Sequence, residues 1–593
     1  MAGEIDIVDE LERELKTLDT PQWKFEGCDS REEYEEQYVR LVDDLYGESE
    51  SAFIKIKRAW MRDIKRVRMD DEHEITGTVS KTDLPLVPPA IEDAVAMTVE
   101  NLPRGNASPR QSSQEDFAGA LNYFMGEEYD ANDFDWIAAR AVFDALVFSF
   151  GCSKQTVDME QSGPLGNVGR VIFKNIDPRY VWPDPRAKSW RWEDMRYLIV
   201  AEPMDLSEVR ERWPGQGHLV TPEGEYSDKR NDLELGETEE VGDGYTVGQR
   251  HRALVKECWL KDGRKVWEAM RNPETGQEEK DSEGKPLGKW VKKYPHGRVV
   301  ITCNGVLLAD VPNPYDHGQP PYSILPGLID GSLMGKGQVR LIGIIADKIN
   351  QLGKDGFRNL RVGCNSPWVA DRNAFDDPDK FHQLTNDPGI VLPVTAGARV
   401  ERLPPAELPQ SYFMFQDWMQ TQFDNVLGRA AVAAGRVEKG SQLSAEAIGN
   451  LQQSSMSRQR LKQRNFERYL KHNGHLLQWN VRQFYPDDMT VELLDPRNGQ
   501  KKIYKWTAEA AKADYSIQIE AGSSMPGAKQ GKEQAGRELY KDGIIDREYA
   551  IRMIDLPGAD ALIERMTKQE EKLASLGMMA ELKKIRPSSK RSA

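Results

Sequence analysis

The sequence predicts an α+β fold, because two different hydrophobic periodicities occur in one chain. Apolar residues three or four positions apart predict long helices at 332–362, 410–427 and 444–484. Short alternating segments bounded by turn residues, such as 298–309, predict strands instead. With 593 residues, 39% of them hydrophobic, the chain can form about three to five structural units with buried cores.

The composition is acidic and argues against several classes of protein. The chain has 96 Asp and Glu against 80 Lys and Arg, a net charge of −16, which disfavours simple non-specific coating of DNA. We expect no membrane span, because no run of about 18 apolar residues occurs. We expect no signal peptide, since the first residues lack a basic and an apolar region. Five scattered cysteines without a C-x-x-C pair predict neither a disulfide framework nor a zinc ribbon, and they fit a reducing compartment.

The first 70 residues predict two helices of opposite charge. Residues 1–50 hold 17 Asp and Glu against 5 Lys and Arg, and 29–46 has the apolar spacing of a helix. Residues 55–68 hold seven basic residues and one acid. We interpret the basic side of this second helix as a solvated face, with binding of a polyanion or an acidic neighbour as the alternative. Its apolar side carries Ala52, Ile56, Trp60 and Ile64.

Residues 88–212 alternate between helical and extended segments. A proline pair at 88–89 begins one helix, and 112–151 has the apolar spacing of two more. Residues 152–173 alternate like a strand pair around a Gly-Pro-Leu-Gly turn. In 176–185 three prolines predict an ordered, extended connection without helix. The other predicted elements are a strand at 197–201, a short helix at 203–212 and a loop at 216–250.

Two hairpins predict a small β-rich insert of about 60 residues beginning at 251. Residues 254–260 and 264–270 flank Lys-Asp-Gly, which is a hairpin signal. Residues 298–303 and 306–309 flank Asn304-Gly305, the strongest short-range hairpin signal in the chain.

The C-terminal third is predicted to be mainly helical. A loop of small residues at 428–440 separates the helix at 410–427 from the very long helix at 444–484, which carries a stripe of basic residues at 458–482. A strand pair is predicted between 490–494 and 517–520. Further helices are predicted at 529–542, 546–554 and 559–584, before a basic tail at 583–591.

The sequence contains no constellation of residues that indicates catalysis. Residues 331–337 resemble a phosphate-binding loop only faintly, because the spacing is one residue short and a glycine replaces the required hydroxyl residue. His472 and His475 could share a helix face, but no third metal ligand is nearby. Acidic clusters at 70–72 and 376–379 are interpreted as solvated loops. We therefore expect no enzyme activity, no cofactor and no metal site.

Four motifs, in their order along the chain, resemble the portal (head-to-tail connector) proteins of tailed bacteriophages, particularly those of short-tailed phages. The motifs are Asn175–Pro185 followed by Asp194-Met195-Arg196-Tyr197; Val299–Gly305 with Pro320-Pro321-Tyr322; Gly335–Val339 with Asp347–Asn350; and Ser444–Ile448 with Gln452-Gln453-Ser454. They span residues 175–455.

The resemblance implies a portal fold assembled as a ring, with a wing, a stem of long helices, a β-rich clip and a helical crown. Its implied boundaries are 1–235 for the N-terminal part of the wing, 236–250 for a first stem arm, 251–325 for the clip, 326–362 for the second stem helix, 363–505 for the C-terminal part of the wing with a tunnel loop at 428–440, and 506–593 for the crown with its basic tail.

The resemblance also implies a function and a set of partners. The chain is expected to form a homo-oligomeric ring, usually a dodecamer, at the portal vertex of the capsid in the virion, assembled in the host cytoplasm. Double-stranded DNA would pass through this ring during packaging and ejection, with no membrane involved. The expected protein partners are the terminase large subunit, the major capsid protein, a scaffolding protein and a tail adaptor or head-completion protein.

Three basic residues of the tunnel loop are the predicted DNA contacts: Arg429, Arg436 and Lys439. They could touch phosphates transiently without reading bases, while the acidic surface of the ring repels the duplex. A plain surface loop is the alternative for 428–440, and pairing with an acidic neighbour is the alternative for the basic stripe. Two other functions remain open, namely another ring-forming virion component such as an adaptor or shell protein, and a nucleic-acid-processing ATPase.

Overall fold

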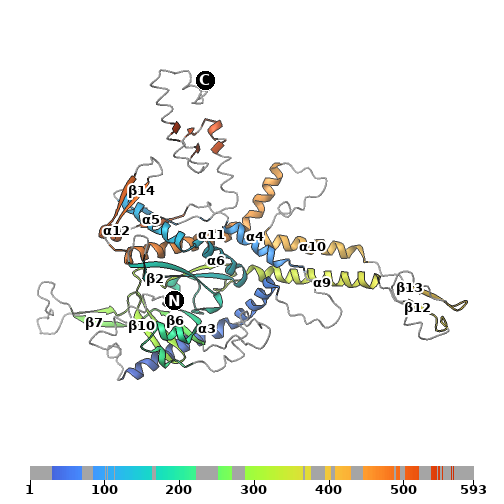
Figure 1. The fold of residues 1–593 in the computed structure, drawn as a ribbon, viewed down its shortest axis with the longest axis horizontal. Helices are drawn as coiled ribbons and strands as arrows, with labels where there is room; N and C mark the ends of the chain where they lie inside the picture. The colour runs from blue at the N-terminus through green and yellow to red at the C-terminus, as the bar shows by residue number, and fades with distance from the viewer. Residues whose placement is uncertain are drawn as a thin grey trace, which may run out of the picture. The chain divides into compact units, whose positions relative to one another are not determined.

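Helices and antiparallel strands mix throughout the chain, which is the α+β class that the sequence predicts (Figure 1). The computed structural model describes residues 30–69, 84–99, 102, 105–111, 114–162, 168–221, 252–269, 288–364, 368–375, 394–402, 408–428, 445–486, 489–494, 501–513, 515–519 and some residues between 536 and 566.

The chain divides into two compact units, each built from separated stretches of sequence. The first unit comprises 1–61, 94–337 and 460–593, and the second comprises 62–93 and 338–459. Three helices have residues in both units: α3 (Arg31–Arg68), α4 (Val87–Val99) and α11 (Ala445–Phe484).

Two antiparallel sheets form the centre of the first unit. The larger has the strand order β10 (Val306–Pro312), β9 (Arg298–Cys303), β6 (Arg252–Leu260), β5 (Tyr197–Asp205) and β4 (Val181–Pro183). The smaller has the order β11 (Tyr322–Pro326), β2 (Phe150–Ser162) and β3 (Val168–Ile176). Three strand pairs complete the unit: β1 (Asn106–Pro109) with β16 (Tyr515–Gln518), β14 (Met489–Leu494) with β15 (Lys501–Trp506), and β7 (Lys265–Ala269) with β8 (Gly288–Lys292).

Helices cover these strands with strongly apolar faces. Helix α6 packs along β2 so closely that a Cβ on Gly151 would overlap the Ala141 carbonyl group. Trp60 of α3 packs edge-on against Phe148 and Phe150 at the junction of α6 and β2. The helices and short 3-10 turns of this unit are α5 (Glu115–Ala131), α6 (Phe134–Phe148), η2 (Pro178–Tyr180), η3 (Trp192–Asp194), α7 (Leu206–Arg212), η4 (Gly217–Leu219) and α12 (Ala508–Lys512).

Most elements predicted from periodicity are confirmed. The helix at 410–427 has the predicted ends, and the two helices within 112–151 are α5 and α6. The β9–β10 hairpin turns at Asn304 and Gly305, whose φ angles of 45° and 81° belong to the left-handed region that a type I′ turn requires. Helix α9 begins at Gln338, six residues after the predicted start at 332.

The hairpin predicted across Lys261-Asp262-Gly263 is wrong. Strand β6 is paired on both edges, with β5 and with β9, so that β7 pairs with β8 instead. The Asp262 side chain accepts a hydrogen bond from the Arg264 amide, which turns the chain out of the sheet at this point. Three of the strands predicted as a separate insert, β6, β9 and β10, therefore belong to the same sheet as β4 and β5, whereas β7 does not.

Three further expectations need correction. The predicted pairing of 490–494 with 517–520 is wrong, since β14 pairs with β15 and β16 pairs with β1. The two helices predicted within 29–68 are one continuous helix, α3. The proline-rich connection contains the short 3-10 turn η2, which Asp177 caps.

The second unit contains two long helices that lie side by side, α9 (Gln338–Cys364) and α10 (Gln410–Leu427) (Figure 1). Between them the chain forms the hairpin of β12 (Trp368–Ala370) and β13 (Val400–Arg402). We call α9, this hairpin and α10 the helical arm. Among the described residues, no helix is both long and apolar enough to cross a membrane.

Candidate assembly and channel surfaces

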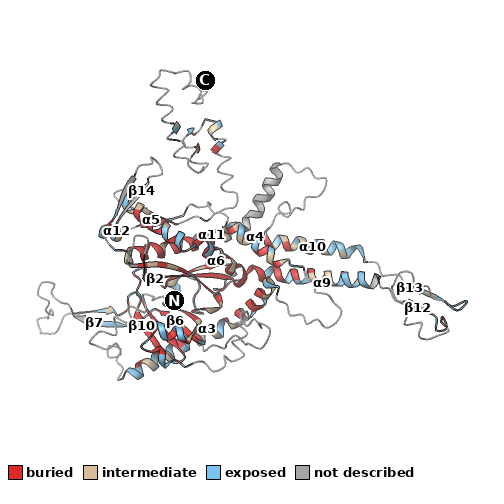
Figure 2. Cartoon of the chain, viewed as in Figure 1, coloured by how far each residue is buried: buried red, intermediate tan, exposed pale blue. Residues whose placement is uncertain are grey.

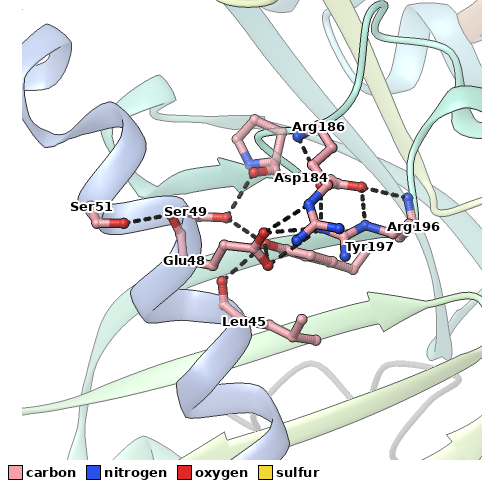
Figure 3. A network of polar contacts seen from close by, with 9 residues as sticks. Leu45, Glu48, Ser49, Ser51, Asp184, Arg186, Arg196 and Tyr197 are labelled. Atoms are coloured by element: carbon pink, nitrogen blue, oxygen red, sulfur yellow. Dashed lines mark hydrogen bonds and ion pairs between the residues drawn. The ribbon is translucent and has the colours of Figure 1, made fainter.

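The proline-rich motif binds α3 to the larger sheet through a network centred on Asp184 (Figure 3). This carboxylate, 1% exposed, accepts hydrogen bonds from the Arg186 and Arg196 amides at 2.9 and 3.1 Å and from the Arg196 guanidinium at 2.7 Å. Burial alone would raise the pKa of Asp184, but these hydrogen bonds outweigh it and lower the pKa. The same guanidinium lies 3.3 Å from Glu48 of α3.

Two further contacts fasten α3 beside this network. The Ser49 hydroxyl donates to the Pro183 carbonyl at 2.7 Å, and the Tyr197 hydroxyl donates to the Leu45 carbonyl at 3.1 Å (Figure 3). The first resemblance motif therefore has a structural role. Its charged residues form hydrogen bonds and ion pairs with one another and with α3.

Lys57 connects the other end of the motif to the same helix. Its buried ammonium donates to the carbonyls of Arg179 and Val181, both at 2.7 Å, and lies 3.2 Å from the centre of the Trp182 ring. Burial lowers the pKa of Lys57 well below its usual value, while nearby Asp177 opposes this shift. Lys57 was predicted on the solvated basic side of its helix, and that placement is wrong.

Polar contacts join the elements of the second unit. Arg66, in the last turn of α3, donates to Asp63 at 2.9 Å and to Asp347 of α9 at 2.7 Å. The Tyr412 hydroxyl of α10 donates to the Leu352 carbonyl, beside Gly356, where a side chain would collide with the tyrosine. These contacts fix α9 against α10 and against the end of α3.

Figure 2 colours much of α9 and α10 as exposed, and large apolar residues are among these exposed positions. Phe413, Met414 and Phe415 are 53%, 66% and 48% exposed, although they are consecutive residues and so point in different directions, about 100° apart. Trp418 stacks on Phe415 at 5.5 Å and is itself exposed. On the neighbouring helix, the exposed apolar residues are Leu341, Ile344, Phe357 and Leu360. A helix that is apolar on several sides is typical of one that other helices cover.

A family model described as phage P22-like portal protein matches residues 49–584, which is nearly the whole chain. The chain belongs to the phage P22-like portal protein family. No curated protein matches the chain. Membership identifies a bacteriophage portal protein, a structural component of the virion rather than an enzyme, from a family that assembles as a ring.

The three predicted DNA contacts of this portal protein lie outside the described residues, as do the first stem arm at 236–250 and nearly all of the tunnel loop. The structure does place both flanks of that loop. Helix α10 ends at Gly428, whose φ of 76° forms a left-handed cap, and α11 begins at Ala445. Residues 429–444 therefore connect α10 to α11.

The basic stripe of α11 does not form one continuous surface. Burial lowers the pKa of Lys462 to about 8. Arg482 donates to the Ala511 carbonyl at 2.5 Å and lies over the Trp479 ring. Arg464, Arg468 and Lys471 are exposed. The basic residues that the sequence pattern groups together therefore differ in their burial.

The two histidines of α11 make hydrogen bonds with neighbouring side chains. His472 contacts the Ser323 hydroxyl at 2.7 Å and Gln319 at 3.1 Å, and His475 contacts Gln478 at 3.2 Å.

The sequence analysis did not identify the exposed apolar residues of the helical arm as a candidate surface. The run Phe413-Met414-Phe415 was a signal that could have revealed it.

Proposed function

We propose that this portal protein closes into a ring of identical copies, most simply a dodecamer, that conducts double-stranded DNA at one vertex of the capsid. The terminase large subunit would drive DNA inward during packaging, and the same channel would release it. The major capsid protein, a scaffolding protein and a tail adaptor would attach around the ring. The observation that carries the ring is the apolar surface of the helical arm.

The exposed apolar residues of the helical arm face different directions, which favours contact with two neighbouring copies rather than one. An isologous dimer covers the same patch on each subunit, whereas a closed ring covers two different patches on every copy. Phe413, Met414 and Phe415 occupy different sides of α10, so a single flat contact would leave part of this surface in water. Two neighbouring arms, one on each side, would cover it.

The structure favours a new assignment of the stem and clip. Helices α9 and α10 lie side by side and are joined through a hairpin, the arrangement expected of two stem helices with the clip between them. We therefore propose α9 and α10 as the stem and residues 365–409 as the clip. Within 251–325, β6 pairs with β5, β11 pairs with β2, and β9 and β10 extend the sheet from β6, so this segment is assigned to the wing.

The remaining boundaries follow from the same contacts. Strand β16 pairs with β1 of the first unit, so we place the start of the crown after Gln518 rather than at 506. The segment 428–440 remains the proposed tunnel loop, because it lies between the second stem helix and α11. Arg429, Arg436 and Lys439 remain the proposed phosphate contacts, and the net charge of −16 per copy supports a channel that repels the duplex elsewhere.

Electron microscopy of the purified full chain tests the ring. We expect rings with a central hole for the native sequence and smaller species for the double variant F357E/L360E, because two carboxylates would oppose burial of α9. The control is Asp355→Ser, an exposed polar position on the same helix. Rings from the double variant, with its far-UV circular dichroism unchanged, would contradict the assignment of α9 to the interface.

DNA passage requires a separate experiment. The triple variant R429A/R436A/K439A should form rings of native size, since it leaves the stem intact. In packaging reactions with terminase and capsid precursors, we expect it to reduce the amount of DNA retained, because the phosphate contacts are lost. Packaging indistinguishable from that of the native ring would exclude these three residues as DNA contacts.

A further inference from the structure

A cavity of about 570 Å³ lies within the first unit. Its walls come from the segment around η3, from β11 with the loop that follows it, and from α11. The lining is mainly apolar, with Trp190, Met195, Ile324, Leu333 and Met334 among its residues. Cavities that bind small ligands typically have a volume of about 300–1,000 Å³ and a mainly apolar lining, and this cavity has both properties.

Two polar atoms of the lining have no hydrogen-bond partner in the described part of the chain. The Trp190 indole nitrogen is buried and donates to nothing, and the Asn465 side-chain oxygen is buried and accepts nothing. Asn465 is only 2% exposed, and its amide nitrogen makes two long contacts of 3.4 Å with the Pro326 and Gly327 carbonyls. Both atoms are covered by the wall itself, so a ligand reaches this unused donor and unused acceptor only when the two side chains turn toward the cavity.

A peptide group supplies the complementary pair. Its carbonyl accepts from an indole N–H, and its own N–H donates to a side-chain amide oxygen. Leaving both protein atoms unpaired in an apolar wall carries a desolvation cost, which a bound main-chain amide would remove.

The lining includes exposed basic residues. Lys188, Arg191 and Arg468 are exposed, and Glu193 is the acid among their neighbours in the lining. Arg191 lies 3.3 Å from Glu193, whereas Lys188 and Arg468 form no ion pair within the described ranges. The remaining positive charge favours an anionic ligand.

We propose that this cavity binds an extended acidic peptide segment of a partner protein, which inserts one bulky apolar side chain. The side chain fills the apolar wall, the adjacent main-chain amide pairs with Trp190 and Asn465, and a neighbouring carboxylate lies near Arg468 and Lys188. The proposal concerns the first unit alone, so it does not depend on ring formation or on DNA passage.

The probe is a synthetic peptide, acetyl-Ser-Glu-Phe-Asp-Ser-amide, with a fluorine on its phenyl ring. Fluorine NMR of this peptide with the full chain at pH 7.5 reports binding through line broadening and chemical-shift change. Two control peptides replace either the aromatic residue by serine or both acids by lysines. We expect both controls to bind at least about tenfold more weakly than the probe.

Matched variants locate the bound peptide. Arg468→Glu should weaken binding about tenfold, whereas Arg464→Glu, an exposed residue one turn earlier on α11 that does not line the cavity, should leave it unchanged. Asn465→Leu removes the acceptor without leaving a large void and should also weaken binding about tenfold. Thermal unfolding verifies that each variant is folded.

Three results would overturn the proposal: no binding by the native chain, equal binding of the lysine peptide, or equal binding by Arg468→Glu and Arg464→Glu. A neighbouring copy in the cavity is the competing occupant. In that case the probe would bind monomers but not rings, and Arg468→Glu would alter the oligomeric state, which counts against a separate partner.

Discussion

Arg298 of β9 and Asp310 of β10 form a buried ion pair beneath helix α3. The Arg298 side chain is fully buried, and its guanidinium donates to Asp310 at 2.8 Å and to the Tyr34 and Tyr38 hydroxyls at 3.2 and 3.1 Å. The Tyr34 hydroxyl also donates to Asp310. Tyr34 and Tyr38, one helical turn apart on α3, thus both contact Arg298 of the larger sheet and orient the helix on that sheet.

Removing one member of this pair should strongly destabilise the larger sheet. Asp310→Ala removes the closer of the two carboxylates that pair with the buried guanidinium and leaves Asp262 at 3.4 Å, so the expected loss is about 3 kcal/mol. The double variant R298M/D310L should lose less than Asp310→Ala, because no unpaired charge remains. Native-state hydrogen exchange of β9 and β10 amides measures this local stability. A single variant as stable as the double one would show that the pair contributes little.

Close packing of α6 on β2 predicts opposite effects for two glycine substitutions. At Gly151 an added Cβ would collide with backbone atoms of Ala141, so Gly151→Ala should destabilise the smaller sheet by roughly 2–4 kcal/mol or prevent folding. Gly126, inside α5, has no atom within 4 Å of an added Cβ, so Gly126→Ala should stabilise its helix by about 1 kcal/mol. Thermal unfolding compares the two, and equal shifts in Tm would contradict this packing.

Local sequence patterns predicted the positions of helices and strands far better than they predicted which strands pair. The apolar spacing at 410–427 and the Asn304-Gly305 turn each depend on neighbouring residues, and both are confirmed. The Lys-Asp-Gly hairpin failed because the edges of β6 are taken by β5 and β9, which are distant in sequence. The pairing of β16 with β1 joins residues about 400 positions apart, and no local signal encodes it.

The proposed functional surfaces depended on information that a single sequence does not contain. Seven basic residues at 55–68 suggested one charged face, but Lys57 is buried because the Arg179 and Val181 carbonyls and the Trp182 ring receive its ammonium. Likewise, Phe357 and Leu360 fit an ordinary apolar stripe until the structure shows that they face solvent. Exposure distinguishes a core stripe from an assembly surface, and exposure follows from tertiary packing.

Lys57 itself provides a test of the first motif. Lys57→Met keeps the length of the side chain but leaves two carbonyls without their donor, so we expect destabilisation by roughly 2–4 kcal/mol. Lys55→Met, at an exposed position on the same helix, should change stability by less than about 0.5 kcal/mol. Chemical denaturation followed by hydrogen exchange near Val181 separates the two. Similar losses for both variants would argue against a specific role for the buried ammonium.

The histidines beside Gln319 predict a loss of stability in mild acid. Burial, with the positive charge of His475, lowers the pKa of His472 to about 4; burial, with neighbouring histidines, lowers that of His317 to about 3. In the unfolded chain both imidazoles would have a pKa of about 6.5, so unfolding takes up protons below that pH. Their contribution is complete above about pH 6.5 and decreases as the pH falls toward about 4.

His472→Gln should reduce this acid sensitivity, because glutamine can still bond Ser323 and Gln319 but does not titrate. We expect the difference in Tm between pH 7.5 and pH 5 to be smaller in this variant than in the native chain. His218→Gln, at an exposed position, serves as the control and should keep the native difference. If His472→Gln and the native chain lose the same stability between these two pH values, the acid sensitivity arises from other groups.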